Sequence, residues 1–87
     1  MDGAATVKAV IDARGLACPM PLVKLRQALM VVAPGEVVRL LATDPQTPDD
    51  VGEFCVAAGH TLLDHRREGE LISLLVAKAG EDASRSS

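Results

Sequence analysis

The hydrophobic positions of this chain follow two periods, one typical of strands and one typical of helices. Short β-branched or continuously apolar runs predict strands. Two apolar stripes that step by three and four predict amphipathic helices, namely Leu22, Leu25, Leu29 and Val32, then Val51, Phe54, Cys55 and Ala58. The predicted strands are residues 7–12, 37–42, 60–67 and 70–78, and the predicted helices are residues 19–32 and 48–58.

This order predicts an α+β fold, a two-layer α/β sandwich with β-α-β-α-β-β connectivity. In a chain of 87 residues two helices cannot cover two faces, so we expect both on one face of a four-stranded mixed sheet. The almost continuously apolar run at residues 37–42 is expected at the centre of that sheet. We expect one domain at residues 6–79, a flexible N-terminus at residues 1–5 and a disordered tail at residues 80–87.

Capping residues mark the ends of the second helix. Thr47 is predicted as the N-cap with Pro48 at the first helical position, and Gly59 as the C-cap. Gly69 supplies the positive φ for a tight turn between the last two strands. Four acids lie around the helix start, and we interpret them as dipole-complementing residues, with an acidic docking edge for a basic partner as the alternative: Asp44, Asp49, Asp50 and Glu53.

The amino-acid composition and net charge count against nucleic-acid-binding and membrane-spanning proteins. Apolar residues make up 48% of the chain, with one Phe and no Trp or Tyr, so the core must be aliphatic. The net charge of −3 argues against a phosphate-backbone binder, and the missing aromatics remove the stacking platforms of single-strand binders. No apolar run approaches the roughly 20 residues that span a bilayer, and the N-terminus does not resemble a signal peptide. We therefore expect a cytoplasmic protein.

Cys18 stands in the most informative segment, Gly-Leu-Ala-Cys-Pro-Met-Pro at residues 15–21. Pro19 disfavours helical angles at the residue before it, which predicts Cys18 as the N-cap and Pro19 as the first helical residue. Pro21 removes one N–H donor, so the N–H of Met20 is expected to serve the sulfur. The helix dipole would then stabilise the thiolate and lower the pKa of Cys18.

Three cations near Cys18 in sequence add to that expectation, namely Arg14, Lys24 and Arg26. Cys18 is therefore predicted to be an exposed, partly ionised nucleophile, with a buried packing role as the alternative. No cysteine lies two positions away and no His lies in the segment, so neither a Cys-x-x-Cys cycle nor a local Cys-His pair is supported. A lone thiolate suits transfer between sulfur atoms.

The segment at residues 12–21 resembles the D-x-R/L-G-L-x-C-P-x-P signature of the TusA family of sulfur-carrier proteins. Pro-Gly-Glu at residues 34–36, Asp44-Pro45 with Asp50, and Phe54-Cys55 also resemble that family. The match covers residues 7–79.

The resemblance implies a sulfurtransferase that carries sulfur as a persulfide on Cys18, with no cofactor and no metal. The motif residues are Gly15, Pro19, Met20 and Pro21. It implies a cysteine desulfurase or rhodanese as donor, and a DsrE-type protein or another acceptor. The destinations known for the family are tRNA 2-thiouridine, sulfur oxidation and molybdenum-cofactor assembly. We expect a monomer whose partner-facing residues include Arg14, Arg26 and Asp44.

Other functions remain open from the sequence. A non-catalytic adaptor or redox-sensing module would use the Cys18 surface without passing sulfur on. An RNA-binding module can share this architecture, but charge and composition count against it. Cys55 is interpreted as a core residue, with a resolving role left open. A zinc site with His60 and His65 is disfavoured, because their odd separation places them on opposite strand faces.

Overall fold

The computed structural model describes residues 7–80 of the chain. Its elements are β1 (Val7–Ala13), α1 (Met20–Val31), β2 (Val37–Ala42), α2 (Thr47–Ala58), β3 (Thr61–Glu68) and β4 (Leu71–Ala77). The four strands form one sheet in the order β1-β2-β4-β3. β1 and β2 are parallel, and the other two pairs are antiparallel.

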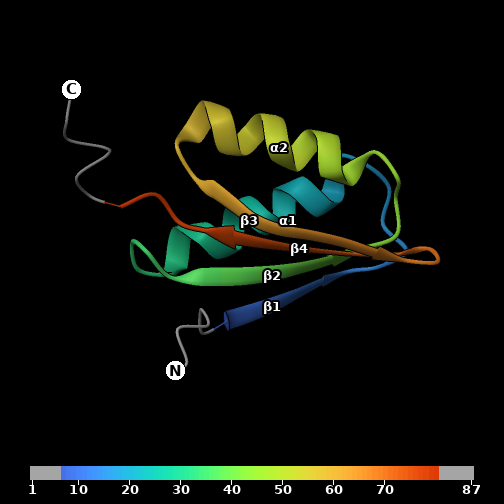
Figure 1. Cartoon of the computed structure of the whole chain (residues 1–87), viewed down its shortest axis with the longest axis horizontal. Coiled ribbons are helices and arrows are strands. Elements are labelled where there is room, and N and C mark those ends of the chain that lie inside the picture. Colours follow the sequence, from blue (N-terminus) through green and yellow to red (C-terminus); the bar gives the residue numbers. More distant parts are fainter. Residues whose placement is uncertain (1–6, 81–87) are drawn as a thin grey trace.

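Both helices lie on one face of this sheet, so the predicted two-layer α+β sandwich is confirmed (Figure 1). α1 packs against β1 and β2, and α2 packs against β3 and β4. β2 is a central strand, as its continuous apolar run predicts.

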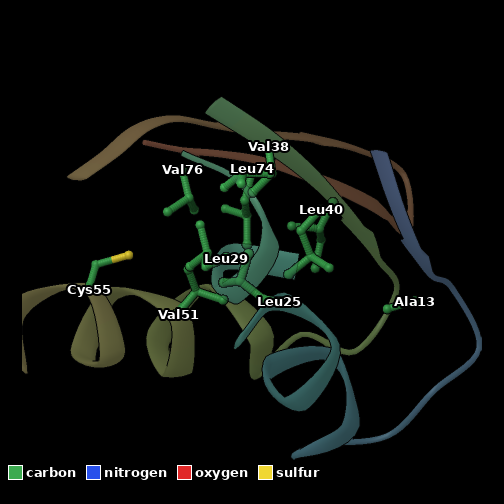
Figure 2. Close-up of a cluster of buried hydrophobic side chains, with 11 residues drawn as sticks. Ala13, Leu25, Leu29, Val38, Leu40, Val51, Cys55, Leu74 and Val76 are labelled. Atoms are coloured by element: carbon green, nitrogen blue, oxygen red, sulfur yellow. The ribbon is translucent and has the colours of Figure 1, made fainter. Parts of the chain in front are cut away.

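The core lies between the sheet and the helices (Figure 2). Alternate residues of the two central strands face it, with Leu40 and Leu74 fully buried. From the helices, Leu25 and Val51 are also fully buried. These aliphatic side chains come from positions that the apolar stripes predict to be inside.

The start of α2 differs by one residue from the prediction. Thr47 is the first helical residue and Gln46 takes the cap position, so Thr47 is not the N-cap. Asp44 explains the shift, because its side chain accepts the N–H of Gln46 at 2.9 Å and its carbonyl accepts the N–H of Thr47 at 3.0 Å. This turn starts the helix earlier, and it leaves the buried Oγ1 of Thr47 without a hydrogen-bond partner.

Two predicted glycine positions are confirmed. Gly59 ends α2 in the left-handed region with φ of 84°, and its N–H donates to the carbonyl of Cys55 at 2.8 Å. Gly69 has a φ of 61° between β3 and β4.

Two glycine-to-alanine substitutions should change stability in opposite directions. Gly52 lies inside α2, and a Cβ there would meet nothing within 4 Å, so Gly52→Ala should raise the free energy of unfolding by about 0.5–1 kcal/mol. Gly15 has a φ of 80°, so Gly15→Ala should lower it by roughly 1–2 kcal/mol. Urea unfolding followed by circular dichroism measures both changes. A stabilised Gly15→Ala would contradict the backbone argument.

No helix between residues 7 and 80 is both long and apolar enough to cross a bilayer. The predicted N-terminal segment 1–5 and the tail beyond Gly80 lie outside the described residues.

Candidate functional site

The site forms where the loops that follow β1 and β2 meet. Because these strands are parallel neighbours, both loops leave the sheet at the same edge, and α1 and α2 begin side by side. The N–H of Gly15 in the first loop donates to Oγ1 of Thr43 in the second at 2.9 Å. Residues far apart in sequence are thereby brought to one place.

Cys18 lies in the turn that leads into α1, and not at the cap of that helix. Pro19 occupies the cap position and the helix begins at Met20, so the predicted N-cap role of Cys18 is wrong. The N–H of Met20 donates to the carbonyl of Ala17 at 2.9 Å, which closes the turn and removes the donor expected to serve the sulfur. The Cys18–Pro19 peptide bond is cis.

The remaining motif residues have distinct places. Gly15 adopts positive φ, as its position in the loop predicts. Pro21, the second residue of α1, is buried, whereas Met20 is 44% exposed. Cys18 itself is half-buried. One side of the motif therefore anchors the loop to the core, and the other side presents the sulfur and an apolar side chain at the surface.

Two acids from the second loop and α2 hold Cys18. Its N–H donates to Oδ2 of Asp44 at 2.7 Å, and its thiol donates to Oδ2 of Asp50. The hydrogen bond to Asp50 raises the pKa of Cys18 from its ordinary value of 9.0 to about 11, with further contributions from desolvation and from the negative charges of Asp50 and Asp44. The bonds from Cys18 and Gln46 hold the pKa of Asp44 below its usual range.

The prediction of a partly ionised thiolate is therefore wrong for the free protein. The helix dipole favours the thiolate, but the adjacent carboxylate accepts a hydrogen bond that only the thiol can donate. The sequence argument weighed residues near Cys18 in the chain, and the deciding group comes from another helix.

Two of the three cations expected near Cys18 make contacts elsewhere. Arg14 forms a two-pronged ion pair with Asp12, with Nε–Oδ1 and Nη2–Oδ2 distances of 2.9 Å. This pair lowers the pKa of Asp12 to about 2. Arg26 lies over the ring of Phe54, 6.0 Å from its centroid. Of the three partner-facing candidates, the structure brings Asp44 into direct contact with Cys18.

Cys55 lies in the core, as its place on an apolar stripe predicts. It is 3% exposed, and burial raises the pKa of its thiol. Figure 2 shows its side chain directed from α2 toward the sheet. Cys18 and Cys55 are both free thiols.

The strand argument that placed the two histidines on opposite faces does not hold. His60 precedes β3, and a register shift between Leu62 and Asp64 lies between the two residues and pairs His65 with Leu74. The ring of His60 packs against Phe54 at 5.3 Å between centroids, and its Nδ1 accepts the N–H of Ala79 at 2.8 Å. Within residues 7–80, no group of three or more His, Cys, Asp or Glu side chains is arranged to hold a metal ion.

Asp50 is the site residue whose contact the sequence analysis missed. Its place in the first turn of α2 suggested a role toward the helix dipole, but its side chain turns to the thiol. A usable signal exists in the sequence, since parallel neighbouring strands place the following helix starts together. An acid in the first turn of the second helix then lies beside a cysteine that precedes the first.

The sequence of this chain is similar to those of known proteins. A family model described as Sulfurtransferase TusA matches residues 9–78. The sulfur carrier protein TusA of Pseudomonas aeruginosa is 41% identical over 63 residues, which cover 72% of this chain and 80% of that protein. The TusA of Pseudomonas syringae pv. tomato is 43% identical over 63 residues, covering 72% of this chain and 75% of the relative.

The fold also has a solved counterpart. The crystal structure of a SirA-like protein from Desulfitobacterium hafniense has a TM-score of 0.71 to this chain at 24% identity, and the match covers 84% of this chain and 99% of the other. At this identity the likeness supports the architecture.

A small α+β sandwich with one accessible cysteine before its first helix defines a class of thiol protein suited to carrying a group between partners. The chain belongs to the TusA family, and its role in general terms is that of a sulfur carrier.

Proposed function

We propose that the protein carries sulfane sulfur as a persulfide on Cys18 and passes it to an acceptor protein. The observation that supports this most directly is the placement of Cys18. Its sulfur lies at the protein surface where two helices begin, whereas the other thiol, Cys55, is 3% exposed in the core. One site is thus available for sulfur to arrive and leave.

The transfer needs no metal, cofactor or oxidant. Cys18 attacks the outer sulfur of a donor hydropersulfide, the S–S bond of the donor breaks, and the donor leaves as a thiol that holds the proton Cys18 gave up. The second transfer repeats the exchange with Cys18 as the donor. The N-termini of α1 and α2 both lie at the site, and their positive dipole ends favour the anionic persulfide.

The proposed partners are those that the resemblance to the TusA family implies. We propose a cysteine desulfurase or a rhodanese as donor and a DsrE-type or other thiol protein as acceptor, in the cytoplasm. Thiolation of tRNA is one destination for the sulfur. Met20 is exposed beside Cys18 and offers an apolar contact, and Arg14, Arg26 and Asp44 remain the proposed polar contacts.

A redox-sensing role fits this site less well. Redox-sensor cysteines are accessible thiols with a low pKa, whereas the contact with Asp50 raises the pKa of Cys18. A protonated thiol reacts slowly with oxidants.

Incubation with a cysteine desulfurase and cysteine should add one sulfur, about 32 Da, to the wild-type protein and none to Cys18→Ser. Reductant should reverse the gain, and intact-protein mass spectrometry measures both. Cys55→Ala, which removes the buried thiol, is the matched control and should still load. Sulfur on Cys18→Ser, or no loading from either a desulfurase or a rhodanese, would contradict the proposal.

A further inference from the structure

Asp50 makes a contact that a persulfide on Cys18 would break. The thiol of Cys18 donates a hydrogen bond to Oδ2 of Asp50. Once a second sulfur is bound, the inner sulfur carries no hydrogen. At neutral pH the outer sulfur is an anion, because a persulfide is a stronger acid than a thiol. The loaded carrier therefore has no proton to offer Asp50 and places a negative charge beside it.

Among residues 7–80, the charges that act on Cys18 include no side-chain cation for the loaded form, and Lys24, the third cation near it in sequence, acts on Asp12. The charged groups that act on Cys18 are Asp50 from α2 and Asp44 from the loop before it, and both are acids. Arg14 is paired with Asp12, and Arg26 lies over Phe54. The positive ends of α1 and α2 act on both forms of the carrier, but the hydrogen bond to Asp50 is available to the empty form alone.

We propose that Asp50 sets the direction of sulfur flow by stabilising the empty thiol of Cys18 over its persulfide, so that the carrier gives up sulfur readily. This inference rests on the proposed function. The exchange that Asp50 biases is Cys18–SH + R–S–S⁻ → Cys18–S–S⁻ + R–SH, in which one S–S bond forms, one breaks, and the proton moves from Cys18 to the departing thiol. The raised pKa of Cys18 follows from the same contact.

The neighbouring acid provides a matched control. Asp49 is also in the first turn of α2, but it is exposed and lies outside the contacts of Cys18. Asp49→Asn changes net charge and helix-end charge as Asp50→Asn does. A difference between the two variants therefore reports the contact of the Asp50 carboxylate with the sulfur rather than the general field of the helix.

The test is an equilibrium with glutathione persulfide and glutathione at a fixed ratio and pH 7.5, read by intact-protein mass spectrometry. Replacing the charged, half-exposed acceptor by a neutral one weakens the hydrogen bond that favours the empty thiol. We therefore expect Asp50→Asn to raise the equilibrium constant for loading about tenfold. Asp49→Asn should stay within twofold of wild type. Asp50→Ala, which removes the acceptor oxygen that the Asn amide keeps, should raise the constant at least as much, and thermal unfolding should show that each variant is folded.

A loading constant for Asp50→Asn and Asp50→Ala equal to or below that of wild type would overturn the role of Asp50 while leaving the carrier function intact. If wild type and all variants fail to load from both glutathione persulfide and the desulfurase, the proposed function itself fails. An equal rise in Asp49→Asn would assign the effect to the helix field and overturn the inference.

Discussion

Alkylation of Cys18 by iodoacetamide is expected to be roughly 10- to 20-fold slower at pH 7.5 than alkylation of an unfolded peptide spanning residues 13–22. A rise in the pKa from 9.0 to about 11 lowers the thiolate fraction about 100-fold at this pH. The more basic thiolate is the better nucleophile, which recovers a factor of about 6 to 10 for a Brønsted slope of 0.4–0.5. The net effect is slower reaction.

The dependence of the alkylation rate on pH tests the direction of the pKa shift of Cys18. The alkylation rate should rise about tenfold per pH unit from pH 7 to pH 10, because the thiol is still mostly protonated there, whereas the peptide should level off near pH 9. The thiol form is stabilised in the folded state, so this stabilisation is complete below about pH 9 and is lost as pH rises through about 11. Peptide mapping after alkylation separates Cys18 from Cys55. A plateau below pH 8 would contradict the contact with Asp50.

Leu25→Ala should lower the free energy of unfolding by about 2–5 kcal/mol. Leu25 is 0% exposed and lies between α1 and the sheet, so truncation leaves a cavity that a tightly packed aliphatic core fills only in part. Small domains are stable by only about 5–15 kcal/mol, so this loss is a large fraction of the total. Urea unfolding followed by circular dichroism measures it.

Met30→Ala is the control for Leu25→Ala. Met30 is on the same helix but is 79% exposed, so the expected change is within about 0.5 kcal/mol. Similar losses in the two variants would contradict the role of core packing, because Ala is the better helix former at both positions and propensity predicts no loss. Sulfur loading by folded Met30→Ala should match wild type if the docking surface is confined to the start of the helix.

The sequence alone predicts the fold well because the fold depends on periodicity. Apolar stripes in steps of three and four, and alternating or continuous runs, identify all six elements to within about two residues. The preference for a central second strand follows from the same pattern. Element starts are less well predicted: Thr47 and Cys18 were expected as caps, but the chain closes local turns one residue away in each case.

The motif at residues 15–21 identifies Cys18 as the candidate carrier, since two prolines and a glycine around a cysteine indicate a shaped loop. The motif by itself does not indicate the protonation state of the Cys18 sulfur. That is decided by Asp50, 32 positions away, and only the parallel pairing of β1 and β2 brings the two helix starts together.

Local sequence thus indicated which atom is the candidate sulfur carrier, because turn geometry and apolar periodicity act over a few residues. The tertiary structure decided how reactive those atoms are. A pKa depends on charges and hydrogen bonds within a few ångströms, and in a folded chain those neighbours come from distant segments.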